Sequence, residues 1–327
     1  MIVITGGAGF IGSCLLAHLN SLGREDILIV DHWEGEGGLK KHNLKNKKFV
    51  RIFDKKNFLD LILKDQIHTQ LESRIEMLIH MGACSSTTLQ DPQYFKENNY
   101  EYSCHLAQWA LRHDCRFIYA SSAATYGDGR QGYQDDIETL KRLQPLNLYG
   151  ESKHKFDLWI LKQGFIDKVV GLKFFNVFGP NEYHKGEMRS VILKAYGQVM
   201  EKGEMGLFKS YRKKYKDGEQ KRDFIYIKDA INIVDFFLKN PQIKGIFNVG
   251  TGIARSWNDL AMALFQAVGK TPCIDYVEMP MTLRSRYQYF TQAEIRKLQG
   301  CGYIKPFTSL EEAVKDYTLY LKNDNYI

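Results

Sequence analysis

A short apolar run that leads directly into a glycine-rich turn is the strongest constraint on how this chain folds. Met1–Thr5 is followed by Gly6, Gly9 and Gly12, and the next segment has the apolar spacing of a helix. Glycines three residues apart allow a tight turn, a close approach of bare backbone to a pyrophosphate and close packing of helix on strand. Asp31 closes the second apolar run, nineteen positions after Gly12. This combination predicts a dinucleotide site at the first strand–helix junction.

Short apolar runs alternate with segments of helical spacing over the first 250 residues. We expect strands at Met1–Thr5, Asp26–Asp31, Glu76–Gly82, Arg116–Ser121, Lys168–Phe174 and Gly245–Val249, and helices over Phe10–Leu22 and Tyr94–Arg112. The runs are bounded by turn residues and do not alternate strictly, which is typical of a sheet covered on both faces. The pattern therefore predicts an α/β fold with a doubly wound parallel (Rossmann) sheet.

The C-terminal third has a looser pattern, in which glycine, proline and charged stretches interrupt shorter elements. Ser256 and Ser309 are expected to be helix N-caps, the second in front of a helix over Leu310–Lys322. We expect this part to form a smaller α/β lobe that binds substrate. The predicted division assigns residues 1–172 with 223–249 to the Rossmann domain and residues 173–222 with 250–327 to the substrate domain.

Composition excludes several classes of protein. The 327 residues are 44% hydrophobic and 25% charged, as in a globular protein, and no apolar run is long enough to span a membrane. The start of the sequence lacks the features of a secretory signal, and the six cysteines form no CxxC pair. No His or Cys cluster has metal-ligand spacing. We therefore expect reduced thiols, a cytoplasmic protein, no bound metal and no membrane partner.

The net charge of +7 is concentrated in two stretches, residues 40–51 and 209–222. Two separate clusters fit phosphate binding on a small ligand, or two solvated loops, better than a continuous nucleic-acid surface. We therefore expect a small-molecule ligand and no nucleic acid.

The residues alone leave the type of dinucleotide open. An acidic residue such as Asp31 at the end of the second strand typically binds the ribose hydroxyls of NAD and repels a 2′-phosphate. Lys40, Lys41 and Lys55 lie within reach of the same corner and would neutralise the additional phosphate of NADP. The alternative for these lysines is an ordinary solvated loop.

A tyrosine and a lysine four residues apart follow the strand that ends in Ser121 and Ser122. Tyr149 and Lys153 share one helix face at this spacing, so the ammonium can lie beside the phenol. A tyrosine acts as a base at neutral pH only if its pKa falls well below its ordinary value of about 10. We expect Lys153 and a positively charged nicotinamide to lower the pKa of Tyr149, and Ser122 to orient the substrate hydroxyl.

These segments together resemble a known superfamily. Thr5–Gly12, Ser121–Gly127 and Tyr149–Lys153 resemble the extended short-chain dehydrogenase/reductases, which include nucleotide-sugar epimerases and dehydratases. Further stretches are similar to the ADP-L-glycero-D-manno-heptose 6-epimerase family, namely Gly82–Thr88, Phe175–Pro180, His184–Gly186, Lys221–Phe224 and Arg286–Gln288.

The resemblance implies an isomerase that inverts C6″ of ADP-D-glycero-D-manno-heptose, by removing a hydride and returning it to the opposite face. It further implies a tightly bound NADP rather than NAD, a place in lipopolysaccharide core biosynthesis, and a homo-oligomer, plausibly a ring of five.

The resemblance also assigns individual residues. Tyr149 and Lys153 would serve the oxidation with Ser122, and Lys185 would be a second acid/base, with a phosphate or sugar anchor as the alternative. The implied cofactor site comprises Phe10, Ile11, Asp31, His32, Lys40, Lys55, Met81, Gly82, Ala83, Cys84, Ser85, Asn98, Lys153, Val177 and Lys185. The implied ADP-sugar site comprises Ser122, Asn176, Glu187, Lys194, Phe208, Lys209, Ser210, Tyr211, Arg222 and Tyr287.

Two of the implied substrate residues have other possible roles. Arg222 suits a diphosphate because its guanidinium matches phosphate oxygens, but an ion pair with its neighbour Asp223 is the alternative. Tyr287 could equally be a packed aromatic between the two lobes.

The chain departs from the family pattern at positions that face the ligand. His32 stands where an amide is usual, and the loop 34–38 is acidic and rich in glycine. Glu187 replaces a small hydroxyl residue, Lys194 replaces a histidine, and the basic stretch 209–221 is longer than usual. A carboxylate near a diphosphate is unfavourable unless paired, so we expect Glu187 to pair with Lys194 or Arg189.

Three other functions share part of this pattern. A 4,6-dehydratase needs an acid and a base where this chain has Ala123 and Ala124, so dehydration is disfavoured. A UDP-hexose 4-epimerase is the nearest alternative, although the segment His184–Gly186 argues against it. A catalytically silent NAD(P)-binding regulatory module is disfavoured because Ser122, Tyr149 and Lys153 are all present.

Overall fold

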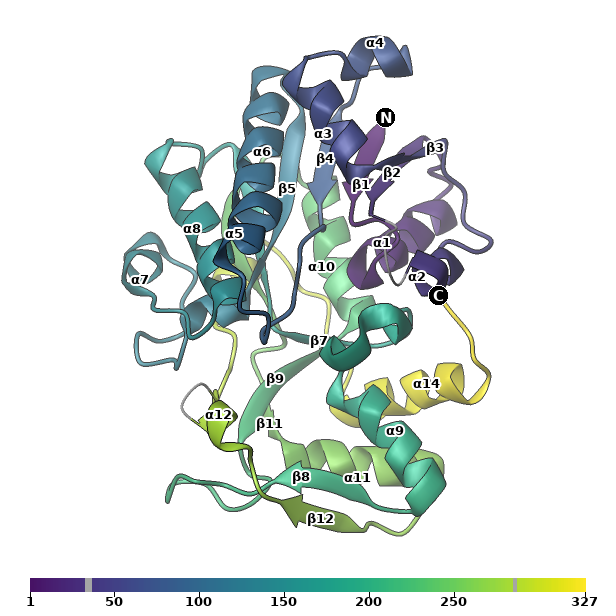
Figure 1. Ribbon diagram of the computed structural model, residues 1–327, viewed down its shortest axis with the longest axis vertical. Helices are drawn as coiled ribbons and strands as arrows, with labels where there is room; N and C mark the ends of the chain where they lie inside the picture. The colour runs from purple at the N-terminus through teal and green to yellow at the C-terminus, as the bar shows by residue number, and fades with distance from the viewer. Residues whose placement is uncertain (33–36, 285–286) are drawn as a thin grey trace.

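The computed structural model describes residues 1–32, 37–284 and 287–327. Its main feature is a parallel sheet of seven strands in the order β10-β6-β5-β4-β1-β2-β3 (Figure 1). These strands are β1 (Ile2–Thr5), β2 (Ile27–Asp31), β3 (Arg51–Asp54), β4 (Met77–His80), β5 (Arg116–Ser122), β6 (Val169–Phe174) and β10 (Gly245–Val249). All six predicted strands are present, and the Rossmann prediction is confirmed.

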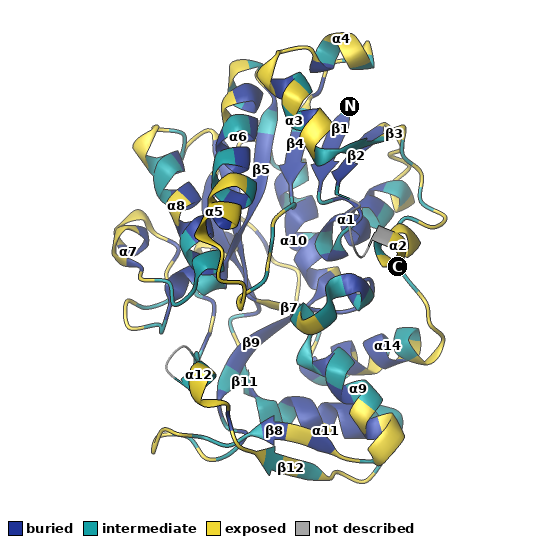
Figure 2. Ribbon diagram, viewed as in Figure 1, coloured by how far each residue is buried: buried dark blue, intermediate teal, exposed yellow. Residues whose placement is uncertain are grey.

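Both faces of the sheet are buried under helices. Ile2 and Ile4 of β1 belong to the core shared with α1 (Phe10–Ser21) and α10 (Ile227–Lys239). Val3, which lies between them, belongs to the opposite core, with α3 (Lys55–Leu63), α6 (Tyr102–Arg112) and α8 (Leu148–Lys162). Successive side chains of a strand point to opposite faces, so a strand buried on both sides is apolar throughout. Figure 2 shows the buried strands between helices with exposed outer surfaces.

Two parts of the large sheet differ from the sequence prediction. The edge strand β3 was missed because it begins with Arg51 and ends with Asp54, and it is only partly buried, so it lacks an apolar run. The helix expected over Tyr94–Arg112 is divided into α5 (Pro92–Phe95), a π-helical stretch η1 (Lys96–Glu101) and α6. A π-helical insertion inside a helix is often found at a functional site.

A smaller region packs beside the carboxyl end of the large sheet (Figure 1). It holds a sheet of β7 (Asn176–Phe178), β9 (Lys221–Tyr226) and β11 (Ala254–Ser256), and a pair formed by β8 (Met205–Phe208) and β12 (Ile274–Val277). Strand β9 belongs to the small sheet and leads directly into α10 of the large one. The domain boundaries proposed from the sequence stay a prediction.

The helices of the smaller region begin where the sequence predicts. Ser256 caps α11 (Trp257–Val268) and Ser309 caps α14 (Leu310–Lys322), and the backbone N–H of each serine donates in return to the acidic side chain three positions on. The remaining helical elements are α2 (Gly37–His42), α4 (Ile67–Leu71), η2 (Ala123–Tyr126), α7 (Ile137–Arg142), η3 (Tyr183–Met188), α9 (Val191–Lys202), α12 (Met281–Arg284) and α13 (Arg296–Gly300).

Among the described residues, no helix is both long and apolar enough to cross a membrane. The same residues contain no group of three or more His, Cys, Asp or Glu side chains that could hold a metal ion. All six cysteines are free thiols.

Candidate active site

The glycine-rich turn leaves no room for side chains. Gly6 has a φ of 68°, and a Cβ on it would lie 2.6 Å from Gly82 Cα. A Cβ on Gly12 would lie 2.2 Å from the carbonyl oxygen of Gly6. Gly9 is the N-cap of α1 and makes no side-chain cap. The first N–H groups of α1 and its positive dipole end are therefore available for a phosphate group, as a pyrophosphate requires.

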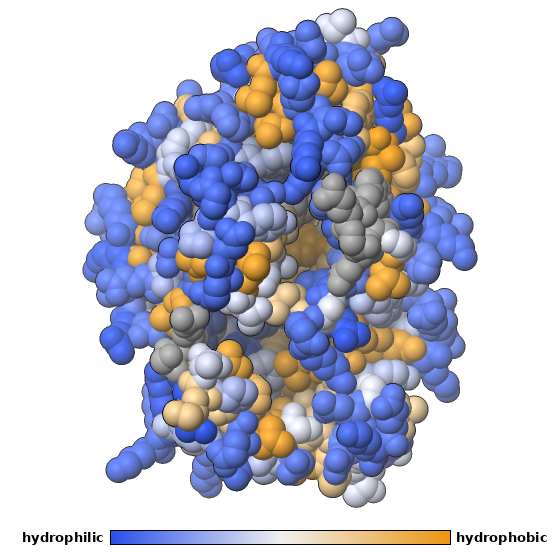
Figure 3. Space-filling view, in the orientation of Figure 1, coloured by the Kyte–Doolittle hydropathy of each residue, from blue (hydrophilic) through white to orange (hydrophobic). Residues whose placement is uncertain are grey.

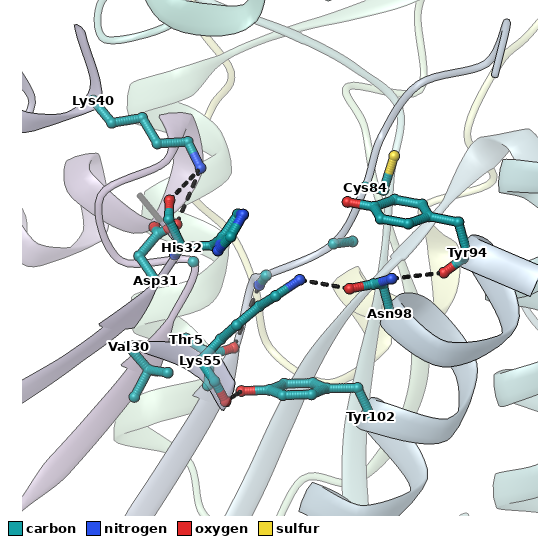
Figure 4. A pocket seen from close by; sticks show the side chains of 13 residues that line it. Thr5, Val30, Asp31, His32, Lys40, Lys55, Cys84, Tyr94, Asn98 and Tyr102 are labelled. Carbon is teal, nitrogen blue, oxygen red and sulfur yellow. Dashed lines mark hydrogen bonds and ion pairs between the residues drawn. The ribbon is translucent and has the colours of Figure 1, made fainter. Parts of the chain in front are cut away.

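Two adjoining cavities open at the carboxyl ends of β1, β2 and β4. The first, of about 240 Å³, is shown in Figure 4, and the second, of about 370 Å³, continues past the glycine turn. Figure 3 shows a hollow at the centre of this face. Every residue proposed for the cofactor lines one or both cavities: Gly6, Gly9, Phe10, Ile11, Gly12, Asp31, His32, Lys40, Lys55, Met81, Gly82, Ala83, Cys84, Ser85, Asn98, Lys153, Val177 and Lys185.

Asp31 at the end of β2 is 6% exposed, and both of its carboxylate oxygens are hydrogen-bonded. One oxygen accepts the N–H of Ala8 at 2.9 Å. The other accepts the N–H of His32 at 2.8 Å and the ammonium of Lys40 at 3.0 Å. Lys40 therefore pairs with the carboxylate of Asp31, a group that would repel a 2′-phosphate.

A second lysine projects into the same cavity from the start of α3. Lys55 donates a hydrogen bond to the amide oxygen of Asn98, and burial lowers its pKa (Figure 4). Lys41 lines neither cavity, so Lys40 and Lys55 are the lysines placed at this corner. Residues 34–36 of the acidic loop lie outside the described part of the chain.

Ser122, Tyr149 and Lys153 line the second cavity together. Ser122 ends β5, and Tyr149 and Lys153 lie in the first two turns of α8, whose N-cap is Asn147. Burial raises the pKa of Tyr149, and a hydrogen bond from the Ser122 hydroxyl opposes the rise. The lowering expected from Lys153 together with a positively charged nicotinamide stays a prediction. In the chain itself, the Lys153 ammonium donates to the Ala120 carbonyl at 2.8 Å.

A buried carboxylate lies one turn beyond Lys153 on the same helix. Burial lowers the pKa of Lys153 to about 8, and the charge of Asp157 opposes that fall. Asp157 is fully buried and accepts bonds from Tyr119 at 2.9 Å, Ser121 at 2.7 Å and Lys173 at 2.6 Å. This network fixes the strand that carries Ser122.

Lys185 reaches the same cavity from the short turn η3. Its ammonium lies 5.2 Å from the centre of the Phe10 ring at the start of α1. Burial lowers the pKa of Lys185, and the charge of Glu182 opposes that fall. The cavity is therefore lined by a phenol from α8 and an ammonium from η3, which are two groups able to exchange protons.

The proposed substrate residues fall into separate clusters, and apart from Ser122 they line neither cavity. Arg222 is 6% exposed, with its guanidinium 5.6 Å from the Trp257 ring centre and 5.1 Å from that of Tyr287. The Tyr287 hydroxyl accepts a bond from Trp257 at 2.8 Å, and its ring lies edge-on to Phe208. Within the described ranges, no acidic side chain forms an ion pair with Arg222.

The alternative of an ion pair between Arg222 and Asp223 is wrong. Asp223 is fully buried, and its carboxylate accepts bonds from the backbone of Thr251, Gly252 and Ala293 at 2.8 to 2.9 Å. Neighbouring residues of a strand point to opposite faces, so Arg222 and Asp223 of β9 are directed away from each other.

The other proposed substrate residues are at the surface. Glu187 pairs with Lys194 at 2.9 Å, as expected for a carboxylate in this position. Lys209 pairs with Glu278 at 2.9 Å, and Tyr211 donates to the same carboxylate. The N–H of Ser210 donates to Asp217 at 2.7 Å, and Asn176 is exposed in β7. Arg286, part of one motif, lies outside the described residues.

Sequence reasoning missed several residues that line the cavities. Tyr94 and Tyr102 lie one helical turn on either side of Asn98, and the i±4 spacing from Asn98 could have indicated them. His184 lies beside Lys185, and burial lowers its pKa to about 4. Phe174 and Met188 gave no signal, because each is an ordinary apolar residue in the sequence.

Comparisons with known proteins agree with this geometry. The family model described as "NAD dependent epimerase/dehydratase family" matches residues 2–250. A Nitratidesulfovibrio vulgaris protein named ADP-L-glycero-D-manno-heptose-6-epimerase is 49% identical over 97% of this chain and 96% of its own length. The Fusobacterium nucleatum protein of the same name is 47% identical, with all of both chains covered.

The chain is also similar to solved structures of nucleotide-sugar epimerases. The crystal structure of Helicobacter pylori ADP-L-glycero-D-manno-heptose-6-epimerase is similar, with a TM-score of 0.80, 29% identity, and 98% of this chain and 96% of that one covered. The UDP-glucuronic acid 4-epimerase of Bacillus cereus, solved with UDP-glucuronic acid and NAD, has a TM-score of 0.80 at 24% identity, with 99% of each chain covered. The second likeness shows the shared fold.

Proposed function

Since this chain belongs to the NAD dependent epimerase/dehydratase family, we propose that it interconverts ADP-D-glycero-β-D-manno-heptose and ADP-L-glycero-β-D-manno-heptose. The observation that carries this proposal is the 49% identity, over nearly the whole of both chains, to a protein named for that reaction. The protein is an isomerase, and the proposed acid–base residues Ser122, Tyr149, Lys153 and Lys185 line its cleft.

The cleft fits a nicotinamide dinucleotide. Its glycine turn has no space for a Cβ at Gly6 or Gly12, and the amino end of α1 opens beside it. The residues that would hold the cofactor are those of the two cavities, with Asp31, Lys40 and Lys55 at the adenosine end and Lys153 at the nicotinamide end. When bound, the nicotinamide supplies reversible hydride transfer at the carbon that is inverted.

The cofactor is NADP rather than NAD. The bond from Lys40 to Asp31 removes the repulsion that an unpaired carboxylate would exert on a 2′-phosphate. Lys55 provides a second ammonium in the same cavity. Arginine and lysine side chains are the usual partners of such a phosphate group.

Acid–base chemistry at the sugar belongs to residues from two sides of the cleft. Tyr149 takes the proton of the C6″ hydroxyl, and Ser122 donates a hydrogen bond to the same oxygen and fixes its position. Lys153 is held by its hydrogen bond to the Ala120 carbonyl and supplies a positive charge near the phenol of Tyr149. Lys185 exchanges the proton when the oxygen lies on the other side of the carbon, as inversion requires.

The nucleotide sugar is held by the smaller region. Arg222 binds the diphosphate, because it is a buried guanidinium near the Trp257 and Tyr287 rings that has no ion-pair partner among the described residues. Asn176, Glu187, Lys194 and residues 208–211 complete the ADP-sugar site. The enzyme is a cytoplasmic homo-oligomer, plausibly a ring of five, that supplies heptose for lipopolysaccharide core. Support for this assignment is the family likeness.

The test is to incubate the purified protein with ADP-D-glycero-β-D-manno-heptose and follow the configuration at C6″, with UDP-galactose as the comparison substrate. We expect inversion of the heptose and no change in the galactose. Conversion of UDP-galactose alone would instead establish a UDP-hexose 4-epimerase. Tightly bound cofactor without turnover of either sugar would establish a regulatory module. Release of the bound cofactor and analysis for the 2′-phosphate distinguishes NADP from NAD.

A further inference from the structure

A fully buried carboxylate lies at the N-cap of the turn that carries Lys185. Glu182 is 0% exposed, and its two oxygens accept four hydrogen bonds. The donors are the N–H of Gly179 at 3.4 Å, the N–H and the hydroxyl of Ser190 at 2.6 Å each, and the hydroxyl of Tyr317 at 3.1 Å. Glu182 thus joins η3 to the start of α9 and to α14.

Burial raises the pKa of the Glu182 carboxyl, and the hydrogen-bond donors around it oppose that rise and favour the ionised form. Two of the four donors are backbone N–H groups, which cannot accept a proton in return. The Ser190 hydroxyl already accepts the N–H of Leu193 at 3.2 Å, as the N-cap of α9. A carboxylate accepts from all four donors, whereas protonation would convert one of its oxygens from an acceptor into a donor.

Lys185 is the positive group that faces this buried charge. Its N–H donates to the backbone carbonyl of Glu182 at 3.0 Å, so the two residues are one turn apart. In the part of the chain that the structure describes, Lys185 has no carboxylate and Glu182 has no cation within ion-pair distance. The two charges therefore attract each other beyond ion-pair distance. Burial lowers the pKa of Lys185, and the charge of Glu182 opposes that fall.

Resting on the proposed role of Lys185 as the second acid/base, we propose that Glu182 is its positioning residue. The fixed negative charge of Glu182 keeps the Lys185 ammonium protonated and ready to donate. Its bonds to Ser190 and Tyr317 hold the η3 turn against the cleft. Glu182 thereby links α9 and α14 of the smaller region to the proton donor.

Other charged groups around Lys185 do not replace Glu182. On η3 itself, His184 is neutral near pH 7 because burial lowers its pKa to about 4, and the exposed Glu187 is paired with Lys194. From β2 and α2, Asp31 and Lys40 neutralise each other. Across the cavity lie Tyr149 and Lys153 of α8. Glu182 itself is faced by Tyr317 of α14, which bonds it, by Tyr183 of η3 and by Cys14 of α1.

The test measures the protonation of Lys185 directly. Purified holoenzyme is labelled with acetic anhydride over a range of pH, and the acetylation of Lys185 is measured by mass spectrometry, because only the neutral amine reacts. In Glu182→Gln we expect the midpoint of Lys185 labelling to fall by about one pH unit, since an opposite charge has been removed. The basic limb of the epimerisation pH profile is expected to fall with it. Exposed Lys48 is the internal reference, with no expected change.

Tyr317→Phe is the matched control, because it removes one bond to Glu182 and keeps the charge. Its labelling midpoint should equal that of the wild type. If Glu182→Gln does not fold, Glu182→Gln/Tyr317→Phe removes one of the groups that the amide has to accommodate and is compared with Tyr317→Phe alone. An unchanged Lys185 midpoint in either folded glutamine variant overturns the proposal. A shifted midpoint in Glu182→Gln, combined with full epimerisation activity in Lys185→Met, would leave the effect of Glu182 on Lys185 intact. It would overturn the acid/base role of Lys185 instead.

Discussion

The ammonium of Lys40 lies 3.0 Å from a carboxylate oxygen of Asp31, at the corner of the cleft where a dinucleotide presents its adenosine ribose. An acidic residue at this position ordinarily selects NAD, because it repels a 2′-phosphate. Here the acidic residue is paired within the chain, and the carboxylate is almost completely buried. The negative charge of Asp31 is therefore balanced by Lys40, whose side chain lines the cavity.

We predict that Lys40→Gln weakens NADP binding by about ten-fold to a hundred-fold, because a hydrogen bond between charged groups contributes roughly 1.5–3 kcal/mol. NAD binding should change much less, since NAD lacks the phosphate. Isothermal titration with each dinucleotide measures the effect. Lys41→Gln is the control, because Lys41 is the next residue and lines neither cavity. Equal losses for NAD and NADP would contradict selection by Lys40.

Tyr149→Phe is predicted to reduce kcat for heptose inversion by about 10²- to 10⁴-fold, the usual contribution of a positioned acid/base group. The variant keeps the ring in place and removes only the hydroxyl that bonds Ser122. Binding of NADP and the melting temperature should therefore stay close to the wild-type values. Single-turnover kinetics with ADP-D-glycero-β-D-manno-heptose provide the measurement. Inversion at the normal rate would exclude Tyr149 as the base.

Local physical rules made much of this molecule predictable. The glycine turn, the buried strands and the caps at Ser256 and Ser309 all follow from interactions within a few residues, and all are present. The parallel pairing of β8 with β12 joins Met205 to Ile274, and no local pattern encodes so distant a contact. The edge strand β3 was missed because an edge needs no apolar run.

The site shows the same division between local and tertiary effects. The sequence placed Tyr149 and Lys153 on one helix face, but the hydrogen bond of Lys153 to Ala120 comes from packing of α8 against β5. Burial raises the pKa of Tyr149 in the chain itself, and no sequence pattern indicated this because burial depends on the complete fold. Arg222 and Asp223 are neighbours in the sequence, yet strand geometry separates their side chains and gives each a different partner.

Lys153→Met is predicted to stabilise the fold while it abolishes inversion. Lys153 is 3% exposed, and burial lowers its pKa to about 8 from an ordinary value near 10.5. Below pH 8 the amine is charged in the folded and unfolded states, so the folded state bears the whole cost of burying the charge. Between pH 8 and 10.5 the unfolded state binds more protons, so the stability of the wild type rises with pH.

The expected gain for Lys153→Met at pH 7 is on the order of 2 kcal/mol, after allowing for the lost bond to Ala120. Urea unfolding of both proteins at pH 7 and at pH 10 measures it. The difference between variant and wild type should shrink at the higher pH. A difference that stays constant across this range would mean that Lys153 titrates normally in the folded protein. Lys162→Met, at the end of the same helix, is the control for adding a methionine to α8.

Arg222→Lys is predicted to raise KM for the nucleotide sugar by about ten-fold or more and to leave kcat nearly unchanged. Arg222 is buried next to the Trp257 and Tyr287 rings, and a lysine would keep the charge but lose the planar fork that matches two phosphate oxygens. Steady-state kinetics give both constants, and equilibrium titration with ADP alone isolates the diphosphate contribution. Arg255→Lys serves as the control, because Arg255 pairs with Glu311 and Asp259 in the same sheet region. If the melting temperature falls and ADP binds as before, Arg222 is a structural cation held by two rings.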